Sequence, residues 1–167
     1  QSTARLAWVV RLRWVAIGAQ LFSILPALEF EVLEPEMLPP FGAVIATLSV
    51  LNIGTWIGLR SGLKGSLGHL WVQLGADILG LSALLILTGG AWNPMVPILL
   101  VHTVLGALLL EGRYGLGLFG LVLASLVLIQ INSHIPPGLS GALVPANILF
   151  PAQIVIALVF WILTAWL

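Results

Sequence analysis

Residues 68–88 read GHLWVQLGADILGLSALLILT, a long apolar stretch with one charged residue, Asp77. A helix needs roughly 20 apolar residues to cross about 30 Å of hydrocarbon. The strict alternation of apolar and polar residues that marks a membrane β-strand is absent from this stretch and from the rest of the chain. Residues 68–88 therefore predict a transmembrane helix, and with it an all-α integral membrane protein.

The composition of the whole chain agrees with this fold class. Of 167 residues, 60% are hydrophobic and 7% are charged, whereas ordinary soluble domains carry about 25% charged residues. Six basic residues balance six acidic ones, so the chain has no basic excess with which to bind nucleic acid. It has no cysteine, which excludes disulfides, thiolate metal sites and thiol redox chemistry within these residues.

Further apolar stretches extend the pattern to a single domain, residues 1–167, with six transmembrane helices. The connections are short, so we expect consecutive spans to lie side by side and antiparallel. The expected spans are residues 6–28, 40–59, 68–88, 94–110, 116–131 and 145–167.

The charges predict how this bundle is oriented. In the six-span topology all six basic residues fall on one side of the membrane, which the positive-inside rule makes cytoplasmic. Both termini then lie in the cytoplasm. The loop between the first two spans carries four glutamates and is expected on the opposite side.

Two polar residues lie near the middle of their spans. Asp77 is at a depth where a charge costs at least about 2.5–3.5 kcal/mol. We expect no basic partner for it, and therefore either a neutral carboxyl that bonds to a residue such as Asn52 or Gln73, or a proton-linked or ligand-binding role. His102, midway along the fourth span, either joins helices or forms a hydrogen bond to a ligand carbonyl.

The other histidines do not complete a metal or haem site. His69 and His134 are expected near opposite membrane surfaces, and no His-x-x-x-His or Glu-x-x-His spacing occurs. No Ser/His/Asp arrangement or glycine-rich phosphate loop can be assembled. We expect no metal, no haem and no catalytic residue in this chain.

The most specific motif is the turn expected between the third and fourth spans, residues 89–95, GGAWNPM. Paired glycines can end a helix, and Asn followed by Pro suits the start of the next one, so a plain hairpin explains these residues. The motif also closely resembles the Gly-Gly-x-x-Asn-Pro-Phe heptapeptide of the RegB/PrrB/ActS family of redox-sensing histidine kinases. Leu12-Arg13-Trp14 with Gln20, and Asp77 with residues 87–90, are similar to the first and third spans of that family. Met95 stands where the family has phenylalanine.

The resemblance implies the membrane sensor domain of a two-component histidine kinase in the bacterial inner membrane. The ligand it implies is a non-covalently bound quinone, ubiquinone or menaquinone, whose redox state is reported to a kinase domain beyond Leu167. A homodimer is the implied assembly. The implied quinone contacts are Gly89, Gly90, Asn93, Pro94, Met95 and His102, with Gln130 as a further polar candidate. The chain itself holds no histidine box and no ATP-binding glycine box, so by itself it is not a kinase.

Two other functions stay open at this point. Many small residues, including 18 glycines, suit an accessory structural subunit of a respiratory or photosynthetic membrane complex. A small transporter that uses Asp77 is the second alternative. It is disfavoured because Asp77 is expected to lack a charged partner and because no pair of interrupted helices accompanies it.

Overall fold

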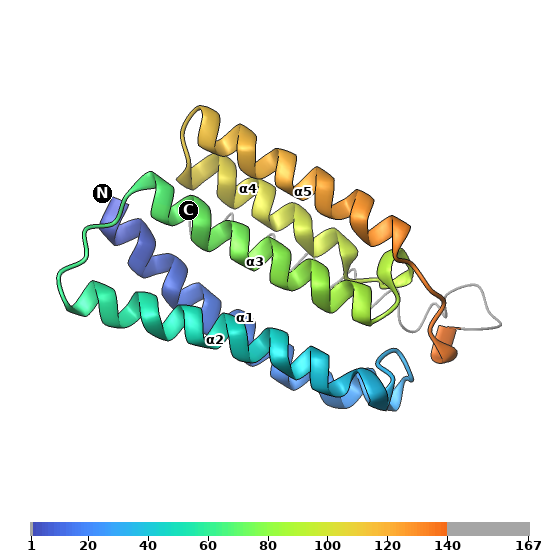
Figure 1. Ribbon diagram of the computed structural model, residues 1–167. Coiled ribbons are helices and arrows are strands. Elements are labelled where there is room, and N and C mark those ends of the chain that lie inside the picture. The colour runs from blue at the N-terminus through green and yellow to red at the C-terminus, as the bar shows by residue number, and fades with distance from the viewer. Residues whose placement is uncertain (1, 140–167) are drawn as a thin grey trace.

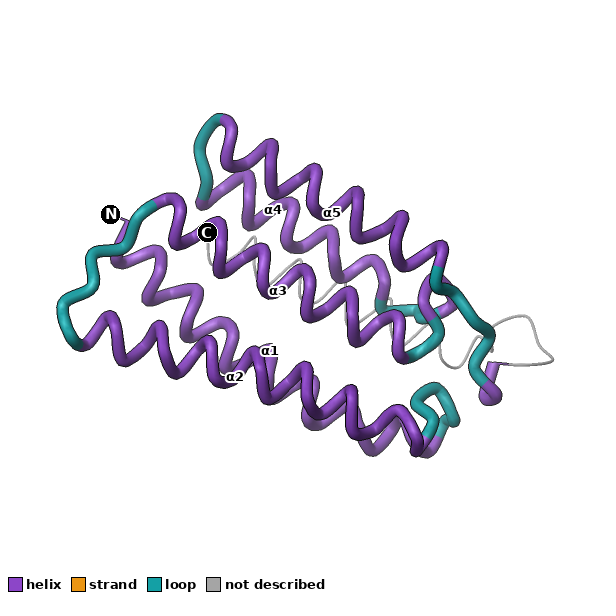
Figure 2. Tube along the Cα trace, viewed as in Figure 1, coloured by secondary structure: helices purple, strands orange, loops and turns teal. Residues whose placement is uncertain are grey.

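The computed structural model describes residues 2–139, which form helices joined by short turns (Figure 1; Figure 2). Short 3-10 helices precede α2 and α4, at Pro35–Met37 and Val96–Ile98, and others lie at Gly90–Trp92 and Pro137–Leu139. The α-helices are α1 (Ser2–Glu29), α2 (Leu38–Arg60), α3 (Leu67–Leu87), α4 (Leu99–Leu109) and α5 (Arg113–Ile131).

Four of these helices are long and apolar enough to cross a membrane: α1, α2 with its preceding 3-10 turn, α3 and α5. The fourth expected span is shorter than predicted, because the apolar helical stretch there covers only Val96–Leu109. The described part of the chain is thus all-helical and has the character of a multi-pass membrane protein. The expected sixth span, residues 145–167, lies outside the described residues.

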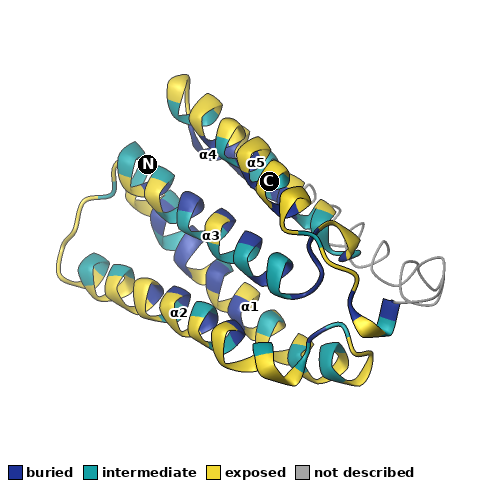
Figure 3. Ribbon diagram, turned by 45° about the vertical axis from the view of Figure 1, so that its right-hand side comes forward, coloured by how far each residue is buried: buried dark blue, intermediate teal, exposed yellow. Residues whose placement is uncertain are grey.

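Helix α3 is the centre of the described bundle and packs against each of α1, α2, α4 and α5 (Figure 1). Leu70, Leu74 and Ile78 recur every four residues along α3, so they form one stripe, and each is at most 1% exposed. They belong to a core that Leu105 of α4 and Leu118 of α5 complete. Residues coloured as exposed lie on the outward faces of the helices (Figure 3), as expected where lipid is the solvent.

The two ends of the bundle differ in charge. One end, called here the basic end, holds Arg5, Arg60, Lys64 and Arg113, and the opposite, acidic end holds Glu29, Glu31, Glu34 and Glu36. At the basic end Arg5 Nη1 donates to the Leu109 carbonyl over 3.1 Å and lies 3.5 Å from Glu111 Oε1. These contacts hold the start of α1 against the turn between α4 and α5.

Arg13 is an exception to the expected charge distribution. It lies eleven residues after Ser2 in a continuous helix, about 16 Å along α1 at 1.5 Å per residue. Only 2% of Arg13 is exposed. The expectation that all six basic residues lie at one membrane surface is therefore wrong for Arg13, which is buried inside the bundle.

Candidate functional site

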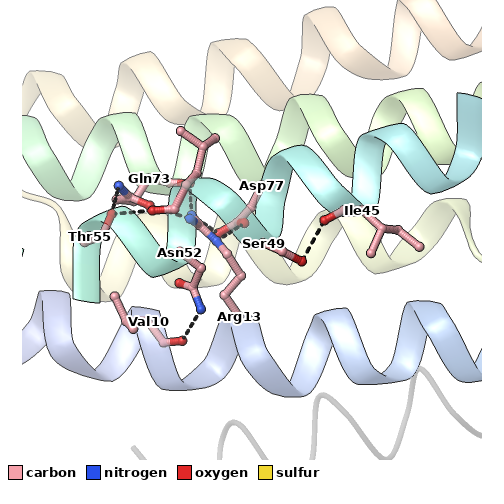
Figure 4. A network of polar contacts seen from close by, with 9 residues as sticks. Val10, Arg13, Ile45, Ser49, Asn52, Thr55, Gln73 and Asp77 are labelled. Atoms are coloured by element: carbon pink, nitrogen blue, oxygen red, sulfur yellow. Dashed lines mark hydrogen bonds and ion pairs between the residues drawn. The ribbon is translucent and has the colours of Figure 1, made fainter. Parts of the chain in front are cut away.

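A buried ion pair joins α1 to α3 in the middle of the bundle (Figure 4). Arg13 Nε donates to Asp77 Oδ1 over 2.6 Å, and Arg13 Nη2 donates to Oδ2 over 2.9 Å. Arg13 also donates from Nη1 to Gln73 Oε1 over 2.5 Å and from Nη2 to the Gln73 carbonyl over 2.6 Å. Four of the five guanidinium hydrogens are thus used within the protein.

This geometry corrects the expectation that Asp77 has no basic partner. A two-pronged arginine–carboxylate contact is one of the stronger and geometrically more specific polar contacts in proteins. The sequence-based argument against a transporter, that Asp77 lacks a charged partner, falls with that expectation. The sequence carries no local signal for this pairing, because Arg13 and Asp77 are 64 residues apart and the positive-inside rule places arginines at the membrane surface.

The polar network extends from the ion pair to α2 (Figure 4). Gln73 Nε2 donates to Thr55 Oγ1 over 2.7 Å, and Asn52 Nδ2 donates to the Val10 carbonyl over 3.0 Å. The expected hydrogen bond from Asn52 or Gln73 to Asp77 is not formed. Gln73 instead accepts hydrogen bonds from Arg13, the same residue that donates to Asp77. The result is that side-chain hydrogen bonds join α1, α2 and α3 at mid-bundle.

A cavity of about 510 Å³ lies beside the ion pair. It is lined mainly by α1, α3, α4 and the turns at the acidic end, with Phe41 and Leu48 of α2. Its wall is mostly apolar. Besides Arg13 and Asp77, the polar residues on this wall are Gln20, Ser23, Thr88, Asn93 and His102. Of the quinone contacts implied by the family resemblance, Asn93, Pro94, Met95 and His102 line the cavity.

Asn93 holds the turn at the acidic end together. Its Oδ1 accepts from the Met95 N–H over 2.8 Å, and its Nδ2 donates to Thr88 Oγ1 over 2.6 Å and to the Thr88 carbonyl over 3.3 Å. Helix α4 begins only at Leu99, so Asn93 does not cap it and Pro94 is not in its first turn. The two amide hydrogens of Asn93 are both used by Thr88, so Asn93 has no free side-chain donor for a ligand in the cavity.

Gly89 and Gly90 are not on the cavity wall but pack against the segment that follows α5. Both have positive φ, +106° and +62°. A Cβ on Gly89 would lie 2.6 Å from Pro136 Cγ, and a Cβ on Gly90 would lie 2.7 Å from Ser133 Cα. Nearby, the Ala91 N–H donates to Ser133 Oγ over 2.9 Å. The paired glycines therefore have a steric explanation: only residues without a side chain fit between these segments.

The tight packing at Gly90 predicts a large effect of a single methyl group. Gly90→Ala is expected to lower the free energy of unfolding in detergent by about 2–4 kcal/mol, from left-handed backbone strain and overpacking against Ser133. Gly120→Ala in α5 is the matched control, since a Cβ there meets no atom of residues 2–139 within 4 Å. The control should be neutral or slightly stabilising. Equal stability of the two variants would contradict the steric account of this turn.

Of two further polar residues, Gln20 lines the cavity and Gln130 does not. Gln20 lines it from α1, although sequence reasoning did not select this residue as a ligand contact. Its spacing of seven residues from Arg13 was the available signal, because positions i and i+7 share one helix face. Gln130, expected as a further polar candidate for the ligand, is exposed on α5 and is not part of the cavity wall.

Among residues 2–139, no group of three or more His, Asp or Glu side chains is placed to hold a metal ion.

The chain matches no protein-family model, no curated protein and no solved structure.

Proposed function

We propose that this chain is the membrane sensor domain of a two-component histidine kinase, and that it binds quinone in the cavity between α1, α3 and α4. One observation carries the proposal: the last three residues of the heptapeptide, Asn93, Pro94 and Met95, share a cavity with His102 and with the Arg13–Asp77 pair. The cavity volume of about 510 Å³ falls within the roughly 300–1,000 Å³ of typical small-molecule sites.

The chemistry of the wall suits a quinone. Small-molecule sites are predominantly apolar with a few placed polar groups, and a quinone combines an apolar ring and tail with two carbonyl oxygens. In this proposal Asn93 shapes the turn, Met95 contacts the ring through its flexible thioether, and His102 supplies a nitrogen for hydrogen bonding. The tail extends along the apolar wall toward the lipid.

The redox signal follows from a change in hydrogen bonding. Two-electron reduction turns both carbonyl acceptors of a quinone into hydroxyl donors. A ligand shifts a conformational equilibrium only by its difference in affinity for the two states. Because the cavity is bounded by α1, α3 and α4, ligand binding would bias how these helices pack. We propose that the ligand is ubiquinone or menaquinone and that the protein forms a homodimer. We also propose that the basic end faces the cytoplasm and that the kinase domain lies outside this chain.

Photochemical cross-linking tests this function. The purified protein in lipid nanodiscs is irradiated with an azido-quinone, and the labelled peptides are identified by mass spectrometry. We expect labels on the α1 and turn–α4 segments that line the cavity, residues 9–30 and 93–105, and we expect excess decylubiquinone to suppress them. Labels spread over lipid-facing residues of α2 and α5, with no competition, would mean simple partitioning into lipid and would defeat the proposal.

A further inference from the structure

Gln20 of α1 lines the cavity, and its side chain has no hydrogen-bond partner among residues 2–139. Its Oε1 is buried and unpartnered, and its Nε2 forms no hydrogen bond within this part of the chain. Ser23 does not supply one, because its hydroxyl donates to the backbone carbonyl of Gln20. A buried polar atom without a partner carries a desolvation cost. A ligand in the cavity that bonds to Gln20 would remove this cost.

The remaining polar side chains on the cavity wall are engaged within the described chain. Besides Gln20, only His102 on this wall has a buried side-chain atom without a partner, Nδ1, and its ring already has a hydrogen bond with the Ile98 backbone. The wall residues whose side chains form hydrogen bonds to other described residues are Arg13, Ser23, Asp77, Thr88 and Asn93. Gln20 is therefore the wall residue whose polar group is left entirely to a ligand.

Gln20 lies on the side of α1 that faces the cavity. Arg13, Ala16 and Gln20 all line the cavity, and their spacing of three and four residues places them on one side of the helix. Gln20 lies seven residues beyond Arg13 in a continuous helix, about 10 Å along α1 toward the acidic end. The α1 wall of the cavity thus carries a free carboxamide between the ion pair and the acidic end.

We infer that the Gln20 carboxamide binds a ring oxygen of the ligand. The inference rests on the proposed quinone site and adds a ligand contact to it. A carboxamide offers two N–H donors and one carbonyl acceptor. Its Nε2 donates to a quinone carbonyl, and its Oε1 accepts from a hydroxyl of the reduced form, so Gln20 contributes to the affinity for both redox forms. One neutral hydrogen bond corresponds to about a threefold to tenfold difference in affinity.

The variant that tests this role is Gln20→Met, because methionine has nearly the same shape but cannot form these hydrogen bonds. The glutamine side chain has no partner among residues 2–139, so we expect equal or slightly higher thermal stability. Equilibrium binding to the full chain in nanodiscs should be about threefold to tenfold weaker for both decylubiquinone and decylubiquinol. Gln130→Met is the matched control, exposed on α5 and outside the cavity wall, and should change neither affinity.

Infrared spectroscopy separates a hydrogen bond to the ligand from a change in the shape of the cavity. Decylubiquinone that is isotope-labelled at its carbonyls is bound to each protein, and the carbonyl stretching bands are recorded. A hydrogen bond from Gln20 Nε2 lowers the stretching frequency of the carbonyl that accepts it. We expect a lowered band in the parent chain and in Gln130→Met. In Gln20→Met this band should return toward the frequency measured in protein-free lipid.

The outcomes separate this inference from the proposed function. Saturable binding that Gln20→Met leaves unchanged overturns the inference and leaves the quinone site standing. Weaker binding with an unchanged carbonyl band also overturns it, because Gln20 would then only shape the cavity. A marked loss of stability in Gln20→Met overturns it as well, since the side chain would then have a partner inside the protein. If neither form binds the parent chain saturably, the proposed quinone site fails, and the inference fails with it.

Discussion

Replacing Asp77 by asparagine is expected to lower the free energy of unfolding by about 3–5 kcal/mol, the usual cost of removing one partner of a buried ion pair. Asparagine fills the same space but leaves the Arg13 guanidinium, whose side chain is 1% exposed, without a counter-charge. The measurement is reversible unfolding of the purified protein in detergent or bicelles. A loss below about 1 kcal/mol would show that the pair is not a stabilising contact.

Two further variants separate charge from shape. The double variant Arg13→Met/Asp77→Leu removes both charges and should regain most of the lost stability, because the desolvation cost of both ions disappears as well. Glu111→Gln serves as the matched control at the basic end. Its partner Arg5 is 3.5 Å away and the Glu111 side chain is 76% exposed, so we expect a change of about 1 kcal/mol or less. A double variant as unstable as Asp77→Asn would contradict this reasoning.

The central helix was predictable because nothing in its sequence interrupts it. The expected span of residues 68–88 became α3, Leu67–Leu87, since one long apolar run with a capping serine before it has few alternatives. Ser66 indeed accepts from the His69 N–H over 3.1 Å. The start of α4 was not predictable in this way. The expected start, with Asn93 as the cap and Pro94 in the first turn, is wrong, because an Asx turn and a 3-10 helix precede Leu99.

The candidate site was predictable in part. The heptapeptide motif pointed to Asn93, Pro94 and Met95, which do line a cavity with His102. The Arg13–Asp77 pair could not be read from the sequence, because the positive-inside rule places arginines at the surface and only the packing of α1 on α3 brings these residues together. The role of the paired glycines depends on Ser133 and Pro136, which are distant in sequence and give no local signal.

Filling the cavity should abolish quinone binding. Ala16 lies on α1 one turn beyond Arg13 and is an exposed residue that lines the cavity, so Ala16→Phe places a ring on the cavity wall. Its side chain replaces empty space rather than packed atoms, and we therefore expect little loss of stability. Ala46→Phe provides the matched control, because Ala46 is exposed on α2 and is not part of the cavity wall.

Equilibrium binding of decylubiquinol to the parent chain, Ala16→Phe and Ala46→Phe in nanodiscs tests the central claim most directly. The account predicts saturable binding at one site per chain for the parent and for Ala46→Phe. It predicts at least a hundredfold weaker binding for Ala16→Phe, with all three proteins unfolding at similar temperatures. Unsaturable partitioning in all three proteins, or equal affinity of Ala16→Phe and the parent, would contradict a quinone site between α1, α3 and α4.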